Sequence, residues 1–188
     1  MDISQIFRSK TRKELFRLYF TNPEQKYYLR ELERSLSIPV SMIRSELLRL
    51  QEDGIFASTK QGNLTYYSLN QAYPLYEELK SIVFKTIGIE GELRKIVDKY
   101  KGIEQAFIYG SYAKNKEKKN SDVDLVLVGS FSRDEFTQEV RALEGKLKRE
   151  INFTAYLPQE FLKESGKKGS FLDLVLNGPR IVLKEKRA

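Results

Sequence analysis

Apolar residues recur with helical spacing through the first fifty positions of the chain. This spacing predicts a helix over residues 3–20, which stops before Thr21-Asn22-Pro23. It also predicts a shorter helix over 29–36 and a third helix from Pro39, a residue that suits a helix start, to Asp53-Gly54. The apolar stripe of the third helix consists of Val40, Ile43, Leu47 and Leu50.

Two runs of β-prone composition follow the third helix. They cover residues 55–60 and 64–69 and flank Gln61-Gly62-Asn63, so they predict a hairpin whose turn contains glycine. Three helices and a hairpin in this order are typical of a winged helix-turn-helix. We therefore assign residues 1–73 to a winged helix-turn-helix DNA-binding domain.

A further amphipathic helix is predicted over residues 74–88 as a linker. It has more apolar surface than a linker needs, contributed by Leu75, Leu79, Ile82, Val83 and Ile87. Three interpretations of this surface stay open. The helix could close the winged-helix core, pack on the second domain or pair with its copy in a dimer.

Helical and strand-like patterns alternate in the second half of the chain. Helices are predicted near 90–100, from Ser132 to Leu147, from Pro158 onward and over 171–176, and strands over 103–109, 122–128, 151–157 and 180–183. This alternation predicts a small α/β domain over residues 89–188. The fold class expected for the whole chain is α+β.

The most specific chemical pattern lies between two of these strands. Gly110-Ser111 follows the first strand, and Asp122-Val123-Asp124 opens the second. A Gly-Ser turn that leaves a strand can open a helix whose free N–H groups face an anion. Side chains alternate along a strand, so Asp122 and Asp124 share one face, where two carboxylates can bind one hard divalent cation. Each piece alone is commonly structural, but together they are expected at neighbouring strand ends, a usual ligand position in open α/β sheets.

The combined pattern of Gly-Ser, ten residues and Asp-x-Asp resembles the signature of the nucleotidyltransferase superfamily that includes DNA polymerase β and kanamycin nucleotidyltransferase. In this short form it looks like the minimal nucleotidyltransferases of prokaryotes, and the resemblance covers about residues 89–188. It implies that Gly110 and Ser111 hold a nucleoside triphosphate. It also implies that Asp122 and Asp124 are catalytic and bind Mg²⁺ or Mn²⁺. The implied reaction transfers a nucleoside monophosphate to a hydroxyl, and pyrophosphate leaves.

A basic tract separates the two halves of this signature. It contains Lys114, Lys116, Lys118 and Lys119. These lysines would attract a triphosphate or an acceptor, and we include Lys114 among the nucleotide-binding residues. A solvated loop is an equally good interpretation.

One position departs from the superfamily pattern. The superfamily normally has a third carboxylate on the following strand, where this chain has Asn152. An amide offers a neutral oxygen to a metal but cannot act as a carboxylate base. Glu150 has the same strand parity as Asn152 and could substitute for the missing carboxylate, although it would lie about 6 to 7 Å away along the strand.

Two functional hypotheses follow. The first is a Mg²⁺-dependent nucleotidyltransferase that modifies a nucleic-acid or protein hydroxyl, as minimal nucleotidyltransferases acting as antitoxins modify a partner toxin. The second is a transcriptional regulator whose transferase-like domain is catalytically impaired and only senses nucleotide.

The segment from Tyr28 to Asn70 resembles prokaryotic winged-helix regulators of the ArsR-like kind. The resemblance covers about residues 10–70 and implies that the third helix enters the DNA major groove. The expected contacts are Ser41, Arg44, Ser45 and Arg49 in the groove, and Lys60, Arg30 and Arg34 at phosphates. Winged helices also serve as protein-interaction modules, and a solvated helix face is the plain alternative.

Composition narrows these hypotheses. The chain of 188 residues has no cysteine and no histidine, so metal binding must use oxygen ligands. Its net charge of +7 favours polyanionic partners such as DNA. Acidic neighbours in the third helix, Glu46, Glu52 and Asp53, weaken that attraction, so we expect DNA binding to need a homodimer. No signal-peptide pattern or membrane-length apolar run is visible, which predicts a cytoplasmic protein without a membrane partner.

Overall fold

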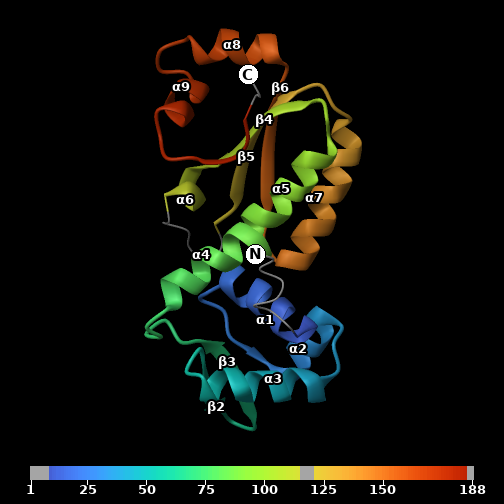
Figure 1. The fold of residues 1–188 in the computed structure, drawn as a ribbon, viewed down its shortest axis with the longest axis vertical. Coiled ribbons are helices and arrows are strands. Elements are labelled where there is room, and N and C mark those ends of the chain that lie inside the picture. The colour runs from blue at the N-terminus through green and yellow to red at the C-terminus, as the bar shows by residue number, and fades with distance from the viewer. Residues whose placement is uncertain (1–8, 115–120, 186–188) are drawn as a thin grey trace. The chain divides into compact units, whose positions relative to one another are not determined.

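The computed structural model describes residues 9–114 and 121–185. The chain divides into two compact units, residues 1–89 and 90–188 (Figure 1). The described strands form two separate sheets, one in each unit, and the fold is a mixed α+β arrangement. No helix within the described ranges combines the length and apolarity that a membrane crossing requires.

The first unit is built from helices around a small antiparallel sheet. Its helices are α1 Lys10–Thr21, α2 Leu29–Leu36, α3 Val40–Glu52 and α4 Tyr76–Thr86. Its strands are β1 Tyr27–Tyr28, β2 Phe56–Gln61 and β3 Leu64–Leu69, in the order β1-β3-β2. The β2–β3 turn contains Gly62 at φ 57°, a backbone conformation that glycine adopts without steric cost.

Helix α4 closes the core of the first unit. Its residues Tyr76 and Val83, together with Ile87 just after it, belong to the same buried cluster as the apolar side chains of α1 and α3. The buried Arg17 of α1 donates from Nε to the backbone carbonyl of Ile87 at 2.8 Å. Of the three interpretations of the helix predicted over 74–88, the structure therefore shows the one in which it completes this core.

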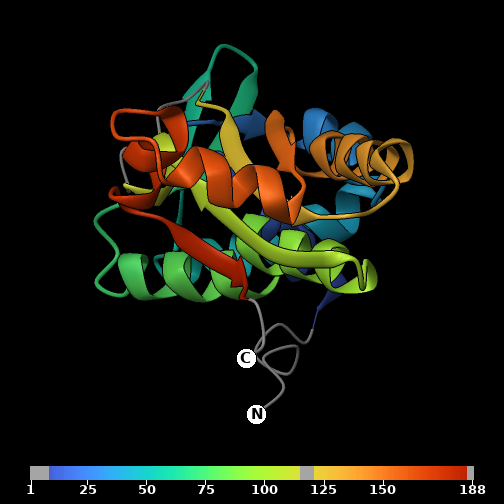
Figure 2. The ribbon, with the colours of Figure 1, turned by 90° about the horizontal axis from the view of Figure 1, so that it is seen from above.

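The second unit is a sheet covered by helices. Its strands are β4 Ile103–Tyr109, β5 Val123–Gly129, β6 Ile151–Tyr156 and β7 Ile181–Lys184, in the order β6-β5-β4-β7. Strands β5 and β6 run parallel, while β4 is antiparallel to both β5 and β7. Figure 2 shows β7 beside β4. Its helices are α5 Ile89–Lys99, α6 Gly110–Ala113, α7 Arg133–Leu147, α8 Pro158–Ser165 and α9 Phe171–Leu176.

The two faces of this sheet have different partners. On one face, Phe107 of β4 and Val126 and Val128 of β5 pack against α8 and α9 in a single buried cluster. On the other face, Phe153 of β6 meets Phe136 of α7 with ring centroids 5.1 Å apart. Side chains at Asp124 and Asn152 have the parity of the first face, so the predicted site opens on the side of α8 and α9.

Most predicted elements lie within a few residues of the observed ones. Helix α2 and strand β3 have the predicted bounds, and α1 is observed from Lys10, while its predicted residues 3–8 lie outside the described ranges. Strand β1 was not predicted. It consists of two residues, and it is a strand only because Tyr27 and Tyr28 pair with Tyr67 and Tyr66 of β3.

Candidate functional site

The end of β4 and the start of β5 meet at one edge of the second sheet. Tyr109, the last residue of β4, stands opposite Asp124 in the antiparallel register. Asp124 also stands beside Asn152 in the parallel register of β5 and β6. Asp122 precedes β5 by one residue and has the same parity as Asp124. The two halves of the sequence signature are therefore adjacent in space.

Gly110 is in close contact with one of the two aspartates. Its φ is 76°, and a Cβ built on it would lie 2.5 Å from Oδ2 of Asp124. Any side chain here would be strained in its backbone and would displace the carboxylate. The glycine of the signature is thus needed to let the backbone after β4 approach Asp124.

The carboxylates of Asp122 and Asp124 repel each other. Partial burial, and then the charge of Asp122, raise the pKa of Asp124 above its ordinary value. Burial and the charge of Asp124 likewise raise the pKa of Tyr109. A cation between the two aspartates would relieve this repulsion, so the electrostatics of the site favour a bound positive charge.

Asn152 is directed at this acidic pair. Its Nδ2 donates a hydrogen bond to Oδ2 of Asp122 at 3.1 Å. The exposed Glu150 contributes its backbone carbonyl to the N–H of Val123 at 2.9 Å. Within residues 9–114 and 121–185, no cluster of three or more Asp, Glu, His or Cys side chains is placed to hold a metal ion. The third carboxylate of the superfamily thus has no counterpart among the described residues.

The side-chain oxygens of Asp122, Asp124 and Asn152 are suitable ligands for Mg²⁺. Mg²⁺ is usually bound through one or two carboxylates, with waters and substrate phosphates completing its octahedron. Asp122 and Asp124 supply two such carboxylates, both partly exposed. The amide of Asn152 would present its oxygen instead of its nitrogen after a half-turn about its last side-chain bond.

The other predicted nucleotide-binding residues lie after β4. Ser111 is half-buried in α6, and Lys114 is exposed at the end of that helix. Of the basic tract, Lys116, Lys118 and Lys119 lie outside the described residues.

Two features near the site were not predicted from the sequence. The buried Arg149 donates from Nη1 to the carbonyl of Ser121 at 2.8 Å, which fixes the backbone immediately before Asp122. Phe171 of α9 packs its ring on Tyr109. Both residues are distant from the signature in the sequence, so no local pattern links them to it. For Arg149, the sequence offered only its place just before a predicted strand.

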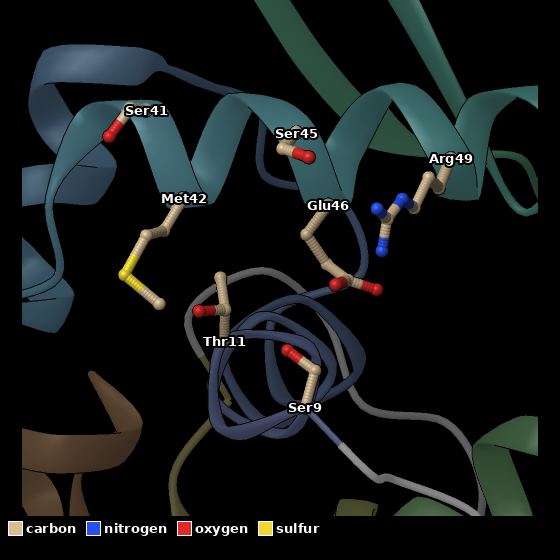
Figure 3. Close-up of a pocket in the computed structure, with 7 residues that line it drawn as sticks. All are labelled: Ser9, Thr11, Ser41, Met42, Ser45, Glu46 and Arg49. Atoms are coloured by element: carbon tan, nitrogen blue, oxygen red, sulfur yellow. The ribbon is translucent and has the colours of Figure 1, made fainter.

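The predicted DNA contacts are exposed on the first unit. Ser41, Arg44, Ser45 and Arg49 are all exposed on α3, and Lys60 is exposed on β2. A hollow of about 380 Å³ lies between α3 and the start of α1. Figure 3 shows the side chains that line it. Its lining consists of Ser9, Thr11, Ser41, Met42, Ser45, Glu46 and Arg49.

The acidic neighbours on α3 differ in their surroundings. Glu46 is buried and accepts from Nε of Arg12 at 2.5 Å, so its charge is compensated by α1. Glu52 and Asp53 are exposed. At the expected phosphate contacts, Arg30 pairs with Glu33, while Arg34 donates to the hydroxyl of Tyr28 at 3.1 Å.

Residues 91–173 match the family model described as Polymerase beta, Nucleotidyltransferase. The matched range contains Gly110, Ser111, Asp122, Asp124 and Asn152. The second unit therefore carries a nucleotidyltransferase-like domain. No curated protein matches the chain.

Several solved structures are similar to parts of the chain. A toxin-antitoxin with AMP-PNP is 15% identical, over 52% of this chain and 74% of that one, with a TM-score of 0.39. A mutant of ZitR from Lactococcus lactis in apo form is 21% identical, over 52% and 74%, with a TM-score of 0.36. The adhesin competence repressor AdcR from Streptococcus pyogenes is 18% identical, over 52% and 76%, with a TM-score of 0.36. At these TM-scores the similarities support no functional inference.

Proposed function

We propose that the second unit binds a nucleoside triphosphate with Mg²⁺ or Mn²⁺ and transfers a nucleoside monophosphate to a hydroxyl acceptor. The observation that carries this proposal is the contact between Gly110 and Asp124, which joins the two halves of the signature at one sheet edge. The match of residues 91–173 to the nucleotidyltransferase family model supports it.

Each residue of the site has a role in this proposal. Asp122 and Asp124 hold the cation, and Gly110 and Ser111 hold the β and γ phosphates through the backbone after β4. Lys114 attracts the triphosphate. When bound, the cation would neutralise the negative charge that develops on phosphate oxygens during transfer.

The proposed reaction forms one bond and breaks another. The acceptor hydroxyl oxygen bonds to the α-phosphorus, and the bond from that phosphorus to the oxygen bridging the α and β phosphates breaks. Pyrophosphate leaves with the electron pair, and the hydroxyl proton passes to a base or to water. Asn152 cannot take this proton, because its amide is neutral and not basic.

A direct test is the release of pyrophosphate. The pure protein would be incubated with Mg²⁺ and labelled triphosphates, alone and with hydroxyl acceptors, including DNA, RNA and candidate partner proteins. The proposal expects release that disappears in Asp122→Asn. The matched variant Asn152→Asp restores a third carboxylate beside Asp122 and is expected to raise the rate. A rate unaffected by Asp122→Asn would contradict the assignment.

The hydrogen bond from Asn152 to Asp122 favours a second candidate function. An amide at this position leaves the site without a carboxylate base, so the domain would bind nucleotide without turnover and act as a sensor for the first unit. Binding of triphosphate to the wild-type protein without pyrophosphate release, combined with turnover in Asn152→Asp, would establish this alternative.

We propose further that the first unit is a winged helix that binds DNA as a homodimer, with α3 in the major groove. The exposure of Arg44 and Arg49 on α3 and of Lys60 on the hairpin supports this assignment. Arg44→Ala and Arg49→Ala should weaken binding to the gene's own promoter region by about 1 to 3 kcal/mol each. Lys85→Ala removes a similar exposed charge from α4 and serves as the control. Unchanged affinity in both arginine variants would exclude this groove assignment.

A further inference from the structure

An aromatic side chain stands at the rim of the proposed site without a role in it. Phe171, the first residue of α9, packs edge-on against Tyr109, with ring centroids 5.4 Å apart and an angle of 79° between the rings. Tyr109 stands opposite Asp124 and directly precedes Gly110. Tyr109 therefore links the Phe171 ring both to the pair Asp122 and Asp124 and to the predicted phosphate-binding residue Gly110.

Helix α9 holds this ring in a fixed place. Leu172 and Val175 of α9 are buried in the cluster that packs on β4 and β5. Ser170 caps the helix by accepting from the N–H of Asp173 at 3.1 Å, and the carboxylate of Asp173 accepts from the N–H of Gly169 at 2.8 Å. Phe171 itself remains 45% exposed although its ring packs on Tyr109. The molecule thus presents a partly exposed aromatic ring, on a helix anchored by buried neighbours, beside the site.

An exposed aromatic ring next to predicted phosphate-binding residues suits the base of a nucleotide. Aromatic rings prefer offset-stacked or edge-to-face partners, and nucleobases stack on such rings whatever their identity. The base of a nucleoside triphosphate is joined to the phosphates through the ribose, so phosphates bound near Gly110 would keep the base within reach of the surrounding surface, which includes Phe171. The exposed part of the Phe171 ring is a candidate partner for it.

We propose that Phe171, backed by Tyr109, is the platform on which the nucleobase of the bound triphosphate stacks. This proposal rests on the proposed function of the second unit and assigns the base contact within that site. Stacking supplies affinity and orients the α-phosphate relative to the acidic pair. Stacking discriminates only weakly among bases, because every base has a planar ring. The preference that remains is for purines, because their larger ring system covers more of the phenylalanine ring.

The test compares two probes that differ in the base. ATP carries a base and ribose, while inorganic tripolyphosphate carries only the phosphates. With Mg²⁺ present, Phe171→Ala is expected to weaken ATP binding about tenfold, equivalent to about 1.4 kcal/mol, and to leave tripolyphosphate binding unchanged. Leu162→Ala, which removes a side chain 72% exposed on α8, is the matched control and should change neither affinity.

A second variant gives a spectroscopic readout. The chain contains no tryptophan, so Phe171→Trp introduces a single one at the platform. ATP is expected to quench its fluorescence and to bind at least as tightly as to the wild type, whereas tripolyphosphate should leave the fluorescence unchanged. This pattern would not arise if Phe171 only supported the fold.

The outcomes separate the two proposals. If the wild type binds tripolyphosphate as tightly as ATP, or if Phe171→Ala lowers both affinities equally, the platform is overturned while the triphosphate site stands. If the wild type binds neither probe, both the platform and the proposed function are overturned.

Discussion

At the scale of single residues, the site depends on how closely a carboxylate approaches the backbone. The signature predicted that Gly110 and Asp124 would be near each other, because they flank a single connection between neighbouring strands. The structure adds the reason for glycine, because a Cβ at this position would lie only 2.5 Å from Oδ2 of Asp124. A phosphate-binding turn alone would not have required this contact.

Gly110→Ala is therefore expected to damage both stability and ligand binding. The positive φ and the crowding against Asp124 should cost about 1 to 3 kcal/mol of unfolding free energy, measured by urea denaturation. Mg²⁺-dependent binding of ATP should be lost with it. Gly145→Ala is the control, because Gly145 lies within α7 with nothing within 4 Å of its added Cβ. It should stabilise the protein by about 0.5 to 1 kcal/mol.

Asp124→Asn is expected to stabilise the metal-free protein at neutral pH. The pKa of Asp124 is raised in the folded state, so its contribution to stability is present below the ordinary aspartate pKa and lost as the pH rises through the raised value. A neutral amide avoids that loss. With EDTA present, the Tm of the variant should exceed that of the wild type at pH 7 and approach it in acid. A lower Tm of the variant at pH 7 would contradict the raised pKa that we attribute to partial burial of Asp124 and to the charge of Asp122.

At the scale of elements, helix α5 secures the strand β7. Arg94 of α5 donates from Nη1 to the carbonyl of Leu183 at 2.5 Å and from Nη2 to the carbonyl of Val182 at 2.9 Å. Among the described strands, β7 pairs only with β4. The guanidinium thus binds carbonyl groups of a strand that has one strand neighbour.

Arg94→Ala should loosen β7 specifically. Hydrogen bonds to a charged group are worth more than neutral ones, but the Arg94 side chain is 43% exposed, so we expect a cost of about 1 to 2 kcal/mol. Amide hydrogen exchange should accelerate at Ile181–Lys184 more than elsewhere in the sheet. Lys95→Ala removes an exposed lysine from Glu92, which also pairs with Lys146, and should change stability by less than about 0.5 kcal/mol.

Elements were predictable where a local pattern determines them. The periodicity of α3 and the β-prone composition of β3 are properties of consecutive residues, so their bounds could be predicted. Strand β1 depends on pairing with a distant strand and had no such signal. Glu46 shows the same limit. Its position in α3 predicted only that its charge lies next to the expected DNA contacts. Its burial and its ion pair with Arg12 arise from the packing of α1, which the pattern of α3 does not contain.

At the scale of the whole molecule, the sequence could predict the nucleotidyltransferase-like domain of the second half more easily than which segments meet. Only a short connection separates Gly110 from Asp124 along the chain. Phe171 and Tyr109 are also in contact, but β5, α7, β6 and α8 lie between them in the sequence. The position of Asn152 was predictable from strand parity, but the direction of its amide toward Asp122 was not. Contacts between distant segments follow from strand order and helix packing, and no single segment encodes them.

The burial of Arg17 beneath the end of α4 determines where the polypeptide can be cut for expression of its first half. A fragment of residues 1–73 would lack Val83 and Ile87, lose the Tyr76 ring that packs on Phe20 and lose the carbonyl that Arg17 binds. A fragment of residues 1–89 retains all of these. We expect the longer fragment to melt cooperatively by circular dichroism and the shorter one to bind ANS and aggregate. Equal melting behaviour of the two fragments would mean that α4 is dispensable to this core.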